Sequence, residues 1–282
     1  MLSDVDLPTL RRLLALYPVS ALKEKWSEHK RKDKLLDWVV ANAPRKEIEG
    51  FLDEYFSCCK QHIYSYTHQQ DIKELPAFRL PEATKNTDVI SNESRTLLYL
   101  GKMEYHVIFT DPLREDKIVF LWPIRLEFTK DRLLLRFVTM EKDASSYFNE
   151  PSKTIGRRPT EPELVARLES VLGLTTLDLN KGIKHLWDAD LFDGVVNKFK
   201  RAQSTRTETM NPGLGFKKAY PEDYELLKRT PLGPCAFYME EGNEYGFDRF
   251  TADSTRGTIT FPTYTKKQGD TDRFVAEIIN HN

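Results

Sequence analysis

The sequence is poor in cysteine and has no long apolar run, and both features restrict where the protein is expected to work. Its three cysteines, Cys58, Cys59 and Cys235, cannot all pair, and a bridge between adjacent cysteines would be strained. A reducing compartment is therefore expected. The most apolar run, residues 118–124, is far shorter than the ~20 residues of a membrane helix, and the first ten residues lack the pattern of a secretory signal. A cytoplasmic protein (nuclear in a eukaryote) that makes no membrane contact is predicted.

The sequence also has almost no net charge and no recognisable catalytic motif. Lys and Arg total 42 against 43 for Asp and Glu, so any preference for nucleic acid must come from local segregation of charge. The sequence contains no GxSxG, HExxH, P-loop or GxGxxG motif. Cys58 and His62 would share a helix face, but no second pair completes a zinc site. No catalytic residue, metal or cofactor is predicted, and a non-enzymatic protein is favoured.

The apolar content suffices for a folded core, since 40% of the 282 residues are hydrophobic. Residues 7–68 keep apolar side chains at helical spacing, with Pro18 and Pro44 as boundaries. The aromatic run at residues 61–68 is expected to close this helical region. A helical bundle over residues 1–75 is predicted, followed by a linker over residues 76–95, where the sequence becomes polar and contains proline.

From Thr96 the apolar spacing changes to a period of two, which predicts an antiparallel meander over residues 96–140. Central helices are expected over residues 160–202, with Thr160 and Glu163 as a capping box, although residues 195–209 also alternate like a strand. Strands follow over residues 233–280, and the last of these elements is either a strand or a helix. The predicted fold class is α+β, an N-terminal helical bundle followed by a mixed domain centred on an antiparallel β-sheet over residues 96–282.

Basic residues gather in a stretch without acids, residues 195–207. The stretch contains Lys198, Lys200, Arg201 and Arg206, together with Ser and Thr hydroxyls that can also contact phosphate. Two helices followed by a basic segment resemble a winged-helix layout, with Lys181 and Lys184 on the second helix. The competing interpretation is a solvated ribbon that is balanced by the nearby Asp188, Asp190 and Asp193.

A second basic cluster, Lys30, Arg31 and Lys32, lies where one expected helix ends and the next begins. Over residues 7–40 this layout loosely resembles DNA-binding helical hairpins of the SAP type. The connection is longer here and its turn lacks glycine, so no family is assigned.

These clusters lead to the hypothesis of a non-enzymatic protein that binds DNA or RNA, or of a nucleic-acid-contacting subunit of a larger assembly. The first alternative is a protein–protein adaptor, in which the N-terminal helical domain docks a partner and a sheet edge accepts a strand. The second is a divergent metal-dependent nuclease around Glu104 and His106, with Asp88 and Lys117 nearby. It is disfavoured because Glu115-Asp116-Lys117 is expected in a turn, away from a rigid site.

Overall fold

The computed structural model describes residues 2–27, 31–69, 71, 83–91, 93–148, 150–201, 204–209 and 215–282. It confirms the α+β class, with N-terminal helices preceding antiparallel sheet strands. The chain divides into two compact units. Unit 1 combines Met1–Phe56 with His68–Leu174, and unit 2 combines Ser57–Thr67 with Thr175–Asn282. The expected domain boundaries at residues 75 and 95 both fall within the range of unit 1.

Unit 1 begins with a short 3-10 helix and four α-helices that bury their apolar stripes. The α-helices are α1 (Leu7–Ala15), α2 (Val19–Lys25), α3 (Lys32–Asn42) and α4 (Arg45–Glu54). Asp6 caps α1 by accepting a hydrogen bond from the Thr9 amide at 2.6 Å. The Tyr17 hydroxyl donates to the Leu52 carbonyl at 2.8 Å. The sequence-predicted helices of this region are therefore confirmed as far as residue 54.

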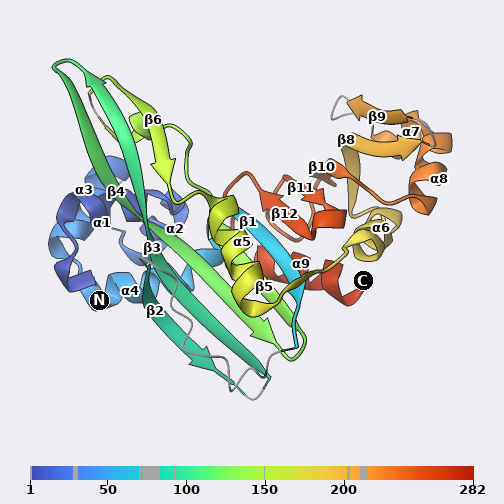
Figure 1. Ribbon diagram of the computed structural model, residues 1–282, viewed down its shortest axis with the longest axis horizontal. Helices are drawn as coiled ribbons and strands as arrows, with labels where there is room; N and C mark the ends of the chain where they lie inside the picture. Colours follow the sequence, from blue (N-terminus) through green and yellow to red (C-terminus); the bar gives the residue numbers. More distant parts are fainter. Residues whose placement is uncertain are drawn as a thin grey trace. The chain divides into compact units, whose positions relative to one another are not determined.

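The sheet of unit 1 is built around one long hairpin, β3 (Ser94–Thr110) and β4 (Leu113–Thr129). In Figure 1 helices α1–α4 gather beside these strands, and α1 contacts β4. The strands β2 (Ala83–Ile90) and β5 (Arg132–Val138) complete the order β2-β3-β4-β5. β6 (Ser152–Arg158) pairs with the same edge of β3 as β2 does. It pairs with residues 104–109 of β3, whereas β2 pairs with residues 95–101. The antiparallel meander expected over residues 96–140 is thus confirmed as β3, β4 and β5.

The linker expected over residues 76–95 is wrong for its second half, because residues 83–90 form β2 and β3 begins at Ser94. Residues 76–82 lie outside the described part of the chain. β2 is an edge strand with mostly polar and partly exposed side chains, so it lacks the apolar alternation that identifies buried strands. Unit 1 ends with α5 (Glu161–Leu172), where Glu163 accepts a hydrogen bond from the Thr160 amide at 2.7 Å, as the capping box predicts.

A group of paired charges joins α4 to the sheet of unit 1. Arg125 on β4 donates to the Asp53 carboxylate at 2.6 Å and lies over the Phe56 ring. The Arg136 side chain on β5 is only 2% exposed, and its Nε lies 2.9 Å from Glu127 Oε2. Because a buried charge is tolerated only when it is paired, these contacts hold the helix and the two strands in one arrangement.

In unit 2 the strands are antiparallel and follow the order β1-β12-β11-β10-β8-β9, and β7 also pairs with β1. The core of this unit holds a cluster of phenylalanines in which the Phe250 ring centroid lies 4.8–4.9 Å from those of Phe192, Phe237 and Phe274. The strands are β1 (Gln61–Thr67), β7 (Thr175–Thr176), β8 (Phe192–Arg201), β9 (Ser204–Thr209), β10 (Pro234–Met239), β11 (Arg249–Asp253) and β12 (Thr258–Phe261). The helices are α6 (Asn180–Asp188), α7 (Phe216–Ala219), α8 (Pro221–Arg229) and α9 (Asp270–Asn280).

The helical interpretation of residues 61–68 is wrong, because residues 61–67 form β1 and pair with β12 from Gln61↔Phe261 to Tyr64↔Thr258. Side chains at alternate positions, Gln61, Ile63 and Ser65, are buried, as in a strand with one covered face. Cys58 and His62 therefore do not share a helix face. Among the described residues, no three His, Cys, Asp or Glu side chains are grouped so as to hold a metal ion. None of the described helices has the length and apolar character to cross a membrane.

Helices α6 and α9 cross so closely at Gly182 that a Cβ atom there would lie 1.8 Å from the Ile278 carbonyl oxygen. We expect Gly182→Ala to lower the free energy of unfolding by about 1–3 kcal/mol, because backbone atoms must move apart. The matched control is Gly50→Ala in α4, where a Cβ meets no atom within 4 Å. It should be neutral or stabilising by up to about 1 kcal/mol. Urea unfolding of both variants tests this crossing, and equal effects would contradict it.

Asp88 on β2 accepts hydrogen bonds from Arg95 Nε at 3.0 Å and Nη2 at 3.1 Å. These bonds, helped by Lys85, lower the pKa of Asp88 to about 2. A lowered folded-state pKa means that the carboxylate stabilises the fold above pH ~4 and loses that effect as the pH falls towards 2. We expect Asp88→Asn to remove about 1–2 kcal/mol of stability at pH 7 and much less at pH 2. Thermal unfolding across this range checks it, with the exposed Asp4→Asn as control.

Candidate nucleic-acid interface

The structure brings together four of the basic residues predicted to contact nucleic acid. Lys198, Lys200 and Arg201 lie on β8 and Arg206 lies on β9, the two strands of one antiparallel hairpin at the end of the unit 2 sheet. The strand alternative for residues 195–209 is therefore the correct one. The side chains of residues 195–201 and 204–209 lie outside the described part of the structure. The backbone register alone fixes the positions of the four residues.

The register separates the four basic residues into two pairs. Lys198 is opposite Thr207 and Lys200 is opposite Thr205, whereas Arg201 is opposite Ser204 and Arg206 is opposite Phe199. Positions two apart on a strand, and positions directly opposite each other, belong to the same face. The two lysines therefore occupy positions on one face of the hairpin, and the two arginines occupy positions on the other.

The base of the hairpin is fixed by Asp193, a residue that the sequence suggested only as a neutralising charge. Its Oδ1 accepts hydrogen bonds from the Trp187 indole at 2.9 Å and the Gly194 amide at 2.7 Å. Its Oδ2 accepts one from the Lys217 amide at 3.4 Å. Asp193 thus connects β8 to α6 and α7, and the neighbouring Phe192 is buried in the phenylalanine cluster. Charge counting along the sequence gives no signal for this role.

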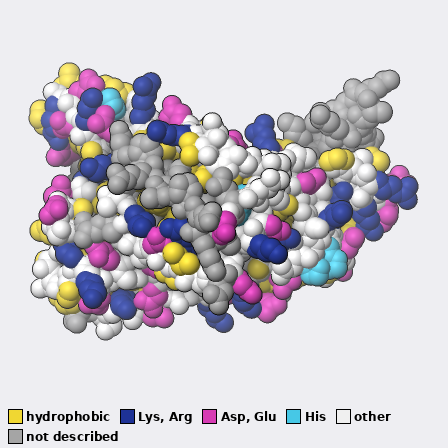
Figure 2. Space-filling view, turned by 60° about the horizontal axis from the view of Figure 1, so that its bottom comes forward, with side chains coloured by type: hydrophobic (Ala, Val, Ile, Leu, Met, Phe, Trp, Pro, Cys, Tyr) yellow, Lys and Arg dark blue, Asp and Glu magenta, His cyan; other side chains and the backbone are white. Residues whose placement is uncertain are grey.

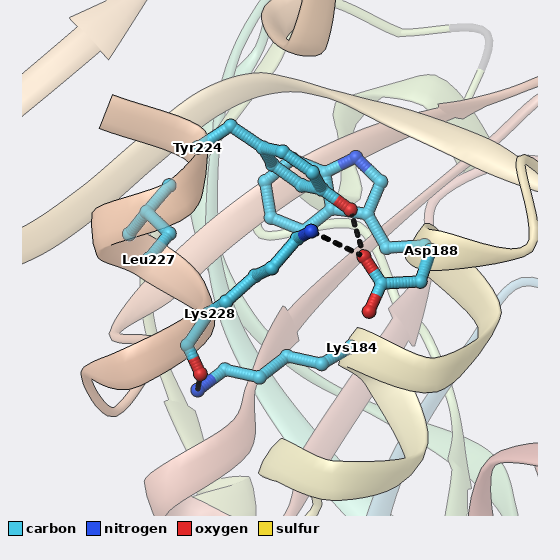
Figure 3. Close-up of a pocket in the computed structure, with 6 residues that line it drawn as sticks. Lys184, Asp188, Tyr224, Leu227 and Lys228 are labelled. Atoms are coloured by element: carbon cyan, nitrogen blue, oxygen red, sulfur yellow. Dashed lines mark hydrogen bonds and ion pairs between the residues drawn. The ribbon is translucent and has the colours of Figure 1, made fainter. Parts of the chain in front are cut away.

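The two other carboxylates that precede the basic stretch also have partners outside it. Asp190 accepts from Lys217 Nζ at 2.5 Å, and the same ammonium donates to the Trp187 carbonyl. Asp188 accepts from the Tyr224 hydroxyl and lies 3.6 Å from Lys228 Nζ. Figure 3 shows Asp188 and Tyr224 meeting between α6 and α8. Burial and this carboxylate together raise the pKa of Tyr224, so the hydroxyl stays a donor. All three carboxylates therefore serve to join unit 2 helices and strands.

The two predicted lysines of α6 have different surroundings. Lys184 is partly buried and its ammonium donates to the carbonyls of Lys228 at 3.2 Å and Thr230 at 2.8 Å, at the end of α8. Burial lowers the pKa of Lys184. Figure 3 shows its side chain extended towards α8, where cations stabilise the exposed carbonyls of a helix end. Lys181 is exposed. Of this pair, Lys181 is the more exposed.

The winged-helix resemblance is not reproduced, because α5 belongs to unit 1 and α6 belongs to unit 2. The second basic cluster also belongs to unit 1. Lys30 lies outside the described residues. Arg31 is largely exposed and lies 3.6 Å from Asp33, while Lys32 donates to the Ala15 carbonyl at 3.1 Å, at the end of α1. On the face shown in Figure 2, Lys and Arg side chains lie interspersed with Asp and Glu.

The residues of the nuclease alternative are only partly assembled. Glu104 Oε1 lies 2.9 Å from His106 Nε2 and 3.5 Å from Lys117 Nζ. The expected turn at residues 115–117 is wrong, because these residues lie within β4. Asp88 is bound to Arg95 and Lys85. Glu104, His106 and Lys117 form a partly exposed charge group on one sheet face, and of these three side chains the carboxylate and the imidazole can bind a metal.

Lys184 and Lys181 form a natural pair for testing which lysine of α6 has a structural role. We expect Lys184→Met to lower the free energy of unfolding by about 1 kcal/mol, because two carbonyls lose their charged donor. Lys181→Met, on the same helix and exposed, should change it by less than about 0.5 kcal/mol. Urea denaturation of both variants measures the difference, and a larger loss for Lys181→Met would contradict these assignments.

Neither protein-family models nor curated proteins give a match to this chain. Function is therefore inferred from the chemistry and placement of its own residues.

Proposed function

We propose that the protein binds nucleic acid, without catalysing a reaction on it, through the basic residues of the β8–β9 hairpin. The observation that supports this most is the engagement of Asp188, Asp190 and Asp193 by groups outside residues 195–207. These carboxylates were the candidates for neutralising the hairpin, and each one has another structural partner. The basic stretch itself contains no acid. The engagement of these three carboxylates elsewhere in unit 2 supports a role of the basic stretch in contacting phosphates.

The two-stranded form of the β8–β9 hairpin suits contacts with phosphates. A two-stranded ribbon at the end of a sheet presents closely spaced residues, and the hydroxyl residues Ser204, Thr205 and Thr207 stand opposite basic ones or next to them along β9. Lys and Arg supply the attraction to phosphate, whereas hydroxyl groups add neutral hydrogen bonds to its oxygens. Contacts of this kind carry little sequence information, so binding should depend strongly on salt and weakly on base sequence.

Lys181 is a further candidate contact because it is exposed on α6, in the same unit as the hairpin. Lys184 and Lys32 are less suitable, since each donates to backbone carbonyls of the protein. Arg31 and Lys30 belong to the range of unit 1, and they would form a separate contact.

Reversing the charge of Lys198, Lys200 and Arg201 to Glu tests the proposal. Binding of a fluorescent 20-base-pair duplex should weaken at least tenfold in anisotropy titrations between 50 and 200 mM salt. The slope of log affinity against log salt should fall by roughly 0.9 for each phosphate that the protein no longer neutralises. The matched control reverses three exposed cations elsewhere in unit 2, namely Arg256, Lys266 and Lys267. The proposal is wrong if both triple variants lose affinity equally, or if the hairpin variant binds like the unchanged protein.

A further inference from the structure

The β8–β9 hairpin extends past the strand that holds it in the sheet. β10 pairs with β8 from Phe192 to Asn197, whereas β9 pairs with β8 as far as Arg201. Lys198, Lys200 and Arg201 therefore all follow the last residue of β8 that is paired with β10. Arg206, opposite Phe199, lies in the same two-stranded part. All four basic residues thus belong to a ribbon that continues beyond its neighbour in the sheet.

Both faces of this ribbon carry two basic positions. Lys198 and Lys200 share one face, and Arg201 and Arg206 share the other, as the register requires. The hydroxyl residues are divided in the same way, with Thr205 and Thr207 on the lysine face and Ser204 on the arginine face. Glu208 follows Arg206 on the arginine face, opposite Asn197 and away from the tip.

We infer that the ligand is a duplex and that the ribbon enters one of its grooves, with a phosphate backbone along each face. This inference rests on the proposed function. A two-stranded ribbon fits the major groove of B-DNA, which is about 12 Å wide and has phosphates along both walls. Two faces with two cations each match two phosphate backbones.

A single strand would favour a different distribution. Proteins that follow a single strand combine cations along one groove with aromatic side chains on which bases stack. Residues 195–209 contain one aromatic residue, Phe199, and their cations are divided between two faces. The division of charge therefore favours a duplex over a single strand.

Two double variants separate the faces: Lys198→Glu with Lys200→Glu, and Arg201→Glu with Arg206→Glu. Each is titrated by fluorescence anisotropy against a 20-base-pair DNA duplex and against a single strand of the same length, at several salt concentrations. Circular dichroism and thermal unfolding establish that both variants are folded. We expect the unchanged protein to bind the duplex at least tenfold more tightly than the single strand. Each variant should bind the duplex at least tenfold more weakly, and the salt slope should fall by roughly 2 in both.

The outcomes distinguish this inference from the proposed function. Binding of the unchanged protein to neither nucleic acid overturns both. Equal binding to duplex and single strand, with both variants impaired, overturns the duplex assignment and leaves nucleic-acid binding standing. Duplex binding that depends on one pair of residues only overturns insertion between two backbones, because a ribbon lying on the surface of the duplex uses one face.

Discussion

The pairing of β1 with β12 is the constraint on which unit 2 depends. It brings residues 57–67 into a unit whose remaining residues all follow Leu174. The entry to β1 is tied as well, since the hydroxyls of Thr265 and Thr271 both donate to the Ser57 carbonyl, at 3.2 and 3.0 Å. Without this strand, β12 would present an unpaired edge, which is a site for aggregation. A fragment that begins at Thr175 would therefore lack part of its own sheet.

The strand order of unit 2 runs from β1 to the basic hairpin. Basic residues are concentrated in this hairpin, although the protein has a formal net charge of −1. Screening limits each exposed charge to about 8–10 Å at physiological salt, so distant acids have little influence on the hairpin. The near carboxylates matter more, and Asp188, Asp190 and Asp193 have hydrogen-bond partners on α8, α7 and α6, respectively. The neutral total is therefore compatible with a local preference for phosphate.

The sequence predicted the elements whose signals are local. Residues 117–140 alternate strongly enough to identify β4 and β5, and the capping box at Thr160 locates the start of α5. It failed where tertiary pairing decides the outcome. The tyrosines at 64 and 66 are compatible with a helix or a strand, and pairing with β12 and β7 selects the strand. At β2 the polar composition of an edge strand hides its period.

The roles of the basic residues in the candidate site also depend on contacts and strand register that the sequence does not show. Composition identified the basic stretch, but it gave Lys184 and Lys181 equal weight, although one caps α8 and the other is exposed. The division of the hairpin cations between two faces is likewise a property of register. Moving β9 by one residue relative to β8 would place Arg206 with the lysines, because side-chain positions alternate with a period of two. Only the observed pairing of Phe199 with Arg206 sets the two arginines on one face. The proposal of a duplex rather than a single strand therefore rests on strand pairing, which the order of residues alone does not contain.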